Sequence, residues 1–396
     1  MNQGWNCKKI GDVCIVERGG SPRPIDDYIT DDPTGINWIK IGDTSDSMFI
    51  TQTAQKIRPE GMKKSRYVQP GDFLLSNSMS FGRPYILKID GCIHDGWLVL
   101  RDEHDCFDKR FLYYYLSSKP TYERFKQMAV GGVVNNLNSE MVRKVNVPIP
   151  PKVEQKQISD CLDKVNNIIS QRKLQLLQYD NLIKARFVEM FGDLADPASK
   201  WPTCRLIEAC DESDDIKCGP FGTQLSKDEY QESGIPVWEI PQINSAFAIA
   251  PEHFLTVEKA AQLRAYSLSV GDIVMSRKGN VGKCAIFPAD KPDGILHSDV
   301  LRIRVSSKIT NPCFMMCQLH YSRDIIRQIE MVSSGAIMAG VNVTKLKEII
   351  VKMPPLELQN QFAAFVYQVD KSKAIIKKAL NKAQLLFDNL MQQYFG

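Results

Sequence analysis

Two long stretches of the chain share a hydrophobic pattern whose steps alternate between four and three residues. The first follows Pro150-Pro151 and runs to about Met190, and the second follows Pro354-Pro355 and runs to the last residues. Apolar positions that repeat every 3.5 residues over about five heptads are typical of helices that pair through a coiled-coil seam. Proline pairs directly ahead favour a sharp start, because proline is tolerated in a first helical turn but cannot extend a helix backwards. We therefore predict two long helices.

The two predicted seams consist mostly of aliphatic and aromatic side chains. The first contains Ile158, Leu162, Val165, Ile169, Arg172, Leu176, Tyr179, Ile183, Phe187 and Met190. The second contains Phe362, Val366, Val369, Lys373, Ile376, Leu380, Ala383, Phe387, Leu390 and Tyr394. The two basic members can reach solvent from the edge of a seam along their apolar stems. At 1.5 Å per residue, helices of about 38 residues would each be about 57 Å long.

Each predicted long helix is the last part of one copy of a longer repeat. Gln155 and Gln359 hold the same place after the prolines, and Phe191-Gly192 matches Phe395-Gly396 at the same offset. Ahead of each helix lies a block of roughly 150 residues, the size of an ordinary domain. Within the blocks, the predicted strands Gly35–Ile41, Gly71–Ser76 and Ile93–Arg101 and the helical segment Phe111–Gln127 correspond to Gly234–Ile240, Gly271–Ser276, Leu296–Arg304 and Phe314–Glu330. This is a two-part internal repeat.

The repeat predicts a mixed α+β and α/β fold. We expect two globular domains at residues 1–150 and 193–354, and two long helices at 151–192 and 355–396. The second block connects the end of the first helix to the start of the second. Antiparallel pairing in a coiled coil would therefore place the similar blocks at opposite ends of one stalk, related by a pseudo-twofold axis.

Composition narrows the functional class without deciding it. The chain has 396 residues, 24% charged, with a net charge of +4, which permits nucleic acid as a partner but does not require it. No apolar run approaches the roughly 20 residues that a membrane helix needs. No apolar secretory segment follows Met1. The eleven cysteines include no Cys-x-x-Cys pair, and Cys313 and Cys317, four apart, favour one buried helix face over a metal site. We expect a cytoplasmic protein without a metal.

Catalytic motifs are absent from the sequence. The segment Gly279–Cys284 lacks the glycine spacing and the hydroxyl of a phosphate-binding loop, and zinc-protease and serine-hydrolase signatures are also missing. His94 and His297 occupy matching places in the repeats. Two copies of one residue at one position favour a hydrogen-bonded framework role over a catalytic one. We therefore expect no catalytic residue in this chain.

Basic side chains in glycine-bearing loops are the main candidates for binding. Arginine and asparagine suit base edges in the major groove of DNA, whereas lysine and serine suit phosphates. The two matching loops, together with a basic and aromatic patch in the first block, supply the candidate DNA contacts Ser76, Asn77, Ser78, Arg83, Lys63, Lys64, Arg66, Arg277, Lys278, Asn280 and Lys283.

Three paired motifs carry a family resemblance: a tryptophan near the start of each block, Gly-Asp-apolar-x-x-Ser at Gly71 and Gly271, and Pro-Pro-x-x-x-Gln at Pro150 and Pro354. With these motifs over its whole length, the chain resembles the specificity subunit of type I restriction-modification systems. The resemblance implies that each block is a target recognition domain for one half of a bipartite, asymmetric site in double-stranded DNA. It also implies that the helices set the spacer and dock two methyltransferase subunits.

The resemblance places all cofactors in the partners. The methyltransferase subunits would bind S-adenosylmethionine, and two restriction subunits, which use ATP and Mg, can join them. For docking and for the coiled coil we single out Glu154, Gln155, Ile158, Leu162, Val165, Ile169, Gln359, Phe362, Val366, Val369 and Ile376. Two alternatives stay open from the residues: a tandem-domain coiled-coil scaffold that binds peptides or glycans, and a hydrolase with an unrecognised site. Steep salt dependence of binding to duplex DNA would favour a DNA-recognition subunit over the scaffold.

Overall fold

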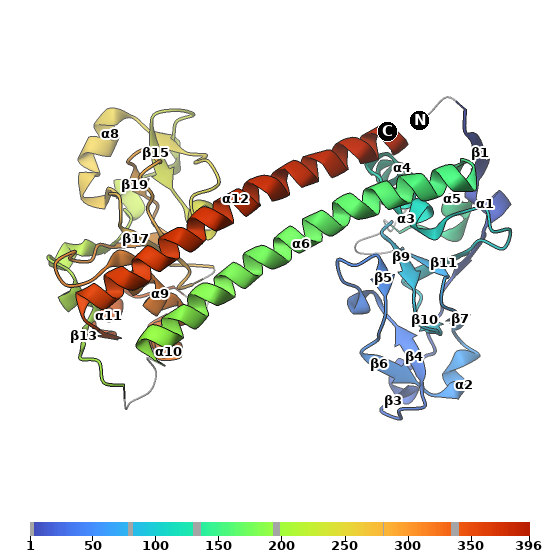
Figure 1. Cartoon of the computed structure of the whole chain (residues 1–396), viewed down its shortest axis with the longest axis horizontal. Helices are drawn as coiled ribbons and strands as arrows, with labels where there is room; N and C mark the ends of the chain where they lie inside the picture. Colours follow the sequence, from blue (N-terminus) through green and yellow to red (C-terminus); the bar gives the residue numbers. More distant parts are fainter. Residues whose placement is uncertain (1–3, 78–81, 130–135, 193–198, 280, 334–339) are drawn as a thin grey trace. The chain divides into compact units, whose positions relative to one another are not determined.

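The computed structural model describes residues 4–77, 82–129, 136–192, 199–279, 281–333 and 340–396. The chain divides into two compact units. Unit 1 comprises Met1–Lys173 and Lys378–Gly396, and unit 2 comprises Leu174–Lys377. Each unit therefore contains one sequence repeat and a part of both long helices, α6 (Lys152–Phe191) and α12 (Leu356–Phe395) (Figure 1).

Unit 1 is built on two five-stranded sheets and a two-stranded ribbon. The sheets have the strand orders β2-β11-β8-β9-β5 and β3-β6-β4-β10-β7, and β1 pairs with β12. A buried cluster that includes Ile39, Leu74 and Trp97 joins the two sheets. The strands are β1 Asn6–Lys9, β2 Ile15–Arg18, β3 Ile29–Thr30, β4 Ile36–Ile39, β5 Phe49–Ile50, β6 Gln55–Ile57, β7 Arg66–Val68, β8 Phe73–Ser76, β9 Pro84–Leu87, β10 Gly91–Ile93, β11 Trp97–Arg101 and β12 Asn146–Ile149.

Unit 2 repeats this plan with smaller sheets. Their strand orders are β14-β20-β17-β18 and β16-β15-β19, and β13 pairs with β21. The parallel pair β15 and β19 corresponds to the parallel pair β4 and β10 of unit 1. The strands are β13 Thr203–Arg205, β14 Ile216–Cys218, β15 Ile235–Trp238, β16 Phe254–Leu255, β17 Ile273–Ser276, β18 Cys284–Ile286, β19 Ile295–Leu296, β20 Val300–Ile303 and β21 Ile350–Lys352.

Short helices cover these sheets in each unit. In unit 1 they are α1 Ile10–Val13, α2 Pro59–Met62, α3 Lys109–Ser117, α4 Lys119–Ala129 and α5 Ser139–Arg143. In unit 2 they are α7 Ile240–Asn244, α8 Val257–Gln262, α9 Pro312–Tyr321, α10 Arg323–Met331 and α11 Val343–Lys347. Each predicted helical segment is therefore two helices. In unit 1 the break precedes Pro120, which fits only the first turn of the second helix.

The predicted strands Ile93–Arg101 and Leu296–Arg304 are also corrected. Each is two strands that belong to different sheets, β10 and β11 in unit 1 and β19 and β20 in unit 2. The chain turns at His94 and at His297, where the imidazole Nδ1 accepts the backbone N–H two residues further on. This local hydrogen bond competes with the ladder of a continuous strand.

The Gly-Asp motif has a structural reason. Gly71 has φ of +96°, a conformation that side chains disfavour. Asp72 then accepts the backbone N–H of Gln69 at 3.0 Å and binds Nε of Arg101 at 3.1 Å. The motif therefore closes a turn and joins two strands of one sheet. Unit 2 uses Gly271 (φ of +91°), Asp272, Ser269 and Arg304 in the same way.

Both long helices contain 40 residues. All predicted seam positions are buried or half-buried. The C-terminal end of α12 packs beside α3 in unit 1, and the C-terminal end of α6 packs beside α9 in unit 2. Phe395 lies 5.5 Å from Phe111 in unit 1, and Phe191 lies 4.7 Å from Phe314 in unit 2, measured between ring centroids. In unit 2 the contacts run in opposite order along α6 and α12, because Phe191 packs against Phe362 whereas Asp180 binds Lys373 at 2.7 Å.

The Pro-Pro-x-x-x-Gln device is an internal clasp. Gln155 is fully buried; its Oε1 accepts the N–H of Asp108 at 2.7 Å, and its Nε2 donates to the carbonyls of Cys106 and Pro150 at 3.0 and 2.8 Å. Asp108 is the residue that caps α3. In unit 2, Gln359 is equally buried and binds Asn311, Thr310 and Pro354. The glutamine thus ties the start of each long helix to the cap of the neighbouring helix.

Candidate nucleic-acid interface

Two loops meet at the turn around His94, which we call the histidine turn, and together with it they form a loop cluster in unit 1. Gly19, from the Gly/Pro-rich loop, donates its N–H to the carbonyl of Trp97 at 2.9 Å. Asn77, at the start of the predicted DNA-binding loop, donates its backbone N–H to Gly96 at 3.0 Å and its Nδ2 to Asp95 at 2.8 Å. The histidine turn therefore holds both loops in place at one edge of the unit.

Glycine is required at this junction in both repeats. A Cβ on Gly19 would lie 2.1 Å from the carbonyl oxygen of His94, and one on Gly219 would lie 2.3 Å from that of His297. Non-bonded atoms do not approach so closely, so only glycine lets the loop pass over the turn. The prediction that the paired histidines are hydrogen-bonded framework residues is confirmed, because Nδ1 of each accepts a backbone N–H, at 2.7 Å in unit 1 and 3.2 Å in unit 2.

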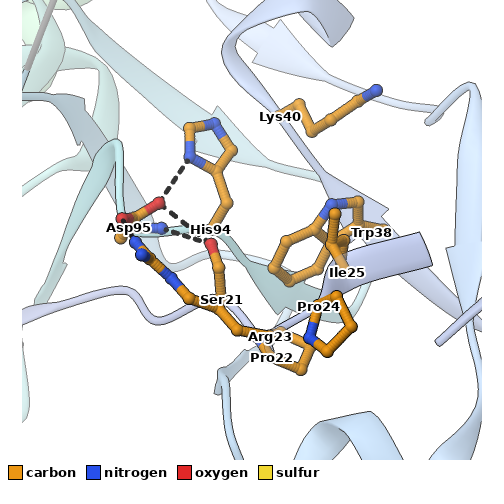
Figure 2. A pocket seen from close by; sticks show the side chains of 9 residues that line it. All are labelled: Ser21, Pro22, Arg23, Pro24, Ile25, Trp38, Lys40, His94 and Asp95. Carbon is orange, nitrogen blue, oxygen red and sulfur yellow. Dashed lines mark hydrogen bonds and ion pairs between the residues drawn. The ribbon is translucent and has the colours of Figure 1, made fainter. Parts of the chain in front are cut away.

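An open hollow of about 640 Å³ lies beside the turn of unit 1 (Figure 2). Its residues combine apolar surface with charge, and they are Ser21, Pro22, Arg23, Pro24, Ile25, Trp38, Lys40, His94 and Asp95. Asp95 accepts from the Ser21 hydroxyl at 2.9 Å and lies 3.5 Å from the exposed guanidinium of Arg23. Burial alone would raise the pKa of Asp95, but the Ser21 hydroxyl, a backbone N–H and His94 outweigh burial and lower it. The hollow therefore offers a fixed carboxylate and two cations.

The matching place in unit 2 contains a different set of charges. Glu239 lies between two histidines: its Oε2 is 2.7 Å from Nδ1 of His253, and its Oε1 is 3.8 Å from Nε2 of His297. Tyr230 stacks on His253 with ring centroids 4.5 Å apart. Asp299, in the turn, binds Nζ of Lys278 at 2.7 Å. The two repeats thus present one backbone arrangement with different side chains.

The predicted DNA-binding loops each end with a cation at the same place. In unit 1 the N–H of Ser76 donates to the carbonyl of Arg83 at 3.1 Å, and in unit 2 the N–H of Ser276 donates to that of Lys283 at 2.9 Å. The guanidinium of Arg83 donates to the carbonyl of Ser45 at 3.3 Å, lies 5.4 Å from the centre of the Tyr85 ring and forms an exposed ion pair with Asp46 at 3.4 Å. Such an exposed pair is worth at most about 1 kcal/mol, so this cation can exchange its partner for a phosphate.

Other predicted DNA contacts have partners within the protein. Arg277 donates Nε to the carbonyl of Val341 at 3.1 Å and lies over the ring of Phe221 at 4.8 Å, and Lys278 pairs with Asp299. These contacts show that the side chains of Arg277 and Lys278 stabilise their own loop.

The basic patch of unit 1 divides in the same way. Lys64 donates to the hydroxyl of Tyr28 at 2.7 Å, Arg66 pairs with Glu17 at 3.1 Å, and Lys63 is exposed. None of these three side chains is among the residues that line the hollow beside the histidine turn.

Two predicted contacts are corrected. Ser76 is fully buried and its hydroxyl accepts the N–H of Arg83 in the same loop, whereas Asn77 is 2% exposed and its Nδ2 donates to the carbonyl of Asp95 in the histidine turn. A buried side chain that already satisfies the backbone cannot also bind a base, so these residues support the site and do not touch the ligand. Ser78 and Asn280 lie outside the described residues.

The helix residues predicted for partner docking or for the coiled coil are mostly inward-facing. Glu154 accepts from Nε1 of Trp5 at 3.2 Å and is half-buried, and Ile376 is also half-buried. Within their own units the others are buried: Gln155, Ile158, Leu162, Val165, Ile169, Gln359, Phe362, Val366 and Val369. Burial fits a place in a helix seam or in the core of a unit, whereas a buried side chain cannot contact a docked partner, so only the docking half of the prediction is corrected for these residues.

The family follows from comparison with known proteins. The family model described as type I restriction modification DNA specificity domain matches residues 2–179 and 215–385, one range over each repeat. The chain belongs to this DNA specificity family. The role predicted from the sequence, that of the DNA-recognition subunit, is thereby confirmed.

Relatives of this specificity family match over most of their length. The EcoKI specificity subunit of Escherichia coli (strain K12) is 21% identical over 99% of this chain and 88% of its own length. The MjaVIII specificity subunit of Methanocaldococcus jannaschii is 22% identical over 96% and 91%. The crystal structure of the S subunit from M. genitalium covers all of this chain and 97% of that one, with a TM-score of 0.59 at 16% identity. This structural likeness shows a shared fold.

Sequence reasoning missed several residues of the specificity subunit's loop cluster. Lys40, Asp95, Glu239 and His253 lie at or beside the histidine turns, yet none lies in a basic loop. An available signal was the end of the matched strands Gly35–Ile41 and Gly234–Ile240, where the repeats differ in charge. Among the described residues, no cluster suited to a metal ion is found, and no helix is long and apolar enough to cross a bilayer.

Acidification is expected to destabilise unit 1 through His94. Burial lowers the pKa of this histidine below its ordinary value, and Asp95 only partly opposes the effect. The folded state therefore binds fewer protons than the unfolded chain just below the ordinary histidine pKa of about 6.5, so stability is lost as the pH falls through that window. We expect the denaturant midpoint of His94→Asn to vary less with pH than that of the wild type. His104→Asn, at an exposed position, is the control that keeps the wild-type slope; equal slopes in all three proteins would contradict the assignment.

Proposed function

We propose that each repeat reads one half of a bipartite, asymmetric site in double-stranded DNA. The observation that carries this proposal is the loop cluster at the histidine turn, which both units build from the same backbone contacts and then furnish with different side chains. Equal scaffolds with unequal side chains suit the recognition of two different half-sites. We assign the two recognition domains to residues 1–150 and 193–354.

The long helices, 151–192 and 355–396, would form the antiparallel coiled coil that sets the spacer between half-sites, with a pseudo-twofold axis. Two observations support this arrangement. The contacts between α6 and α12 in unit 2 run in opposite order along the two helices. The helix ends at Phe395 and Phe191 pack in the same way, against Phe111 in unit 1 and Phe314 in unit 2. Two methyltransferase subunits would dock on the outer faces of the helices, where Leu174, Leu177 and Tyr367 are 55%, 56% and 60% exposed.

The chemistry would reside in the partners. In this proposal the chain is non-catalytic and binds no cofactor, S-adenosylmethionine belongs to the methyltransferase subunits, and ATP and Mg belong to restriction subunits. The experiment is to assemble the chain with its methyltransferase and to sequence the methylation pattern of the DNA that the complex has modified. A bipartite motif supports the proposal. Methylation without a motif, together with duplex binding that is insensitive to salt, would instead favour a protein or glycan scaffold.

The equivalent cations Arg83 and Lys283 are expected to contact phosphates. Replacing either with alanine should weaken binding of the assembled complex to all duplexes alike and reduce the salt slope by about 1, because one fewer counterion is released. Binding isotherms at several salt concentrations measure this slope. Lys126→Ala, an exposed cation on α4, is the matched control and should leave it unchanged. A loss confined to one DNA sequence would show that the cation reads a base instead.

A further inference from the structure

Lys40 and Glu239 occupy one structural position with opposite charge. In unit 1, Ile39 pairs with Ile93 in the parallel ladder and the N–H of His94 donates to the carbonyl of Ile39 at 3.4 Å. In unit 2, Trp238 pairs with Leu296 and the N–H of His297 donates to the carbonyl of Trp238 at 3.0 Å. Lys40 and Glu239 are the next residues in each unit.

Local hydrogen bonds repeat this equivalence. The N–H of Lys40 donates to the side chain of Asp43 at 2.7 Å, and the N–H of Glu239 donates to the side chain of Gln242 at 3.1 Å. Each acceptor lies three residues further on, at the start of a short helical turn. The backbone therefore carries both side chains to the same place beside the histidine turn, and only the charge differs.

Both side chains are placed to meet a ligand at the loop cluster. Lys40 is one of the residues that line the hollow of unit 1 (Figure 2). Its Nζ donates to Oε1 of Gln55 at 2.7 Å. The Glu239 side chain is 19% exposed, and His253 engages its Oε2 at 2.7 Å. The other oxygen, Oε1, is 3.8 Å from His297, beyond hydrogen-bond distance. His253 thus orients a carboxylate that keeps one oxygen able to accept.

Opposite charges at one position have opposite preferences for base edges. In the major groove a lysine ammonium donates to O6 and N7 of guanine, whereas a carboxylate accepts from the N4 amino group of cytosine. A carboxylate is also repelled by phosphates, so a glutamate at a DNA-reading position selects a base amino group. Neither side chain lies in a loop rich in basic residues, so a search of the sequence for such loops overlooks both.

We infer that Lys40 and Glu239 are base-reading residues of opposite chemistry, with Lys40 reading a guanine in the half-site of the first repeat and Glu239 reading a cytosine in the half-site of the second. This inference rests on the proposed function. It assigns one G·C pair in each half-site to a single side chain, and it gives the two half-sites different sequences from one shared scaffold.

The test is the methylation pattern of the assembled complex carrying Lys40→Met or Glu239→Met. Each substitution removes the charge and the polar atoms and keeps a long side chain. We expect each variant to relax one G·C position, with discrimination at that position falling roughly 5- to 150-fold, in one half-site only and in a different half-site for each variant. Lys126→Met and Glu258→Met, at exposed positions outside the loop clusters, are matched controls that should keep the wild-type motif.

The possible results distinguish a failure of the assignment of Lys40 and Glu239 from a failure of the proposed half-site recognition. A uniform loss of methylation at all positions, or an unchanged motif, overturns the assignment of the two residues while the wild-type motif still supports half-site recognition. Relaxation at a position that is not G·C in the wild-type motif also overturns it. A wild-type complex that methylates without a bipartite motif defeats the proposed function itself, before any variant is compared.

Discussion

Replacing Phe395 with alanine is expected to destabilise unit 1 by about 3–5 kcal/mol. The side chain is 1% exposed and packs edge-to-face against Phe111 and Tyr115, with ring centroids 5.5 and 5.9 Å apart. Its removal deletes buried aromatic area and leaves a cavity between the last turn of α12 and helix α3.

Amide hydrogen exchange of the full chain measures this effect locally. We expect faster exchange in α3 and α12 of unit 1, together with a lower denaturant midpoint. Tyr367→Ala is the matched control, because this aromatic residue lies on the same helix and is 60% exposed, and exposed substitutions change stability by about 0.5 kcal/mol or less. A loss below about 1 kcal/mol for Phe395→Ala would contradict the packing role assigned to this ring.

Replacing Gln155 with alanine is expected to cost about 3 kcal/mol. The substitution leaves three backbone groups, one buried and two half-buried, without their partner, and a buried unsatisfied group costs about 1–3 kcal/mol before relaxation or entry of water. Those groups are the N–H of Asp108 and the carbonyls of Cys106 and Pro150. The loss should appear at the junction of α6 with the cap of α3, because the glutamine joins these two elements.

Two variants make the test specific. Gln157→Ala removes an exposed glutamine from the same helix and should leave the denaturant midpoint unchanged. Gln155→Glu keeps an acceptor for the Asp108 N–H but cannot donate to the two carbonyls, so it should destabilise at least as much as alanine. If Gln155→Glu were as stable as the wild type, the donated hydrogen bonds would carry no stability, and the clasp would be wrongly assigned.

The framework of the two units follows closely from local sequence signals. The seam of period 3.5 and the proline pairs predicted helices α6 and α12, which the structure places at Lys152–Phe191 and Leu356–Phe395. The Gly-Asp motifs predicted the strands that begin at Phe73 and Ile273. These signals are local: a turn that requires positive φ, a helix start and a hydrophobic period all act within a few residues.

The candidate site was less predictable, because burial decides which polar residues face a ligand. Ser76 and Asn77 begin a run of polar residues, yet the fold turns both inward: the Ser76 hydroxyl accepts the N–H of Arg83, and Asn77 donates to the carbonyl of Asp95 in the histidine turn. Lys40 and Glu239 end unremarkable strands, yet the parallel ladder carries them to that turn. Composition cannot separate these cases, because the hydrogen-bond partners come from distant parts of the chain.

By itself the sequence determined that this protein is a twofold repeat closed by two matched helices, since that information lies in short motifs and in their spacing. The tertiary structure alone decided that Gln155 and Gln359 face inward as clasps and that the helix ends at Phe191 and Phe395 are core residues. It also placed Lys40 and Glu239, which already match in the sequence, beside the histidine turns. Such facts depend on which surfaces meet, and long-range packing and hydrogen bonding settle that only when the chain has folded.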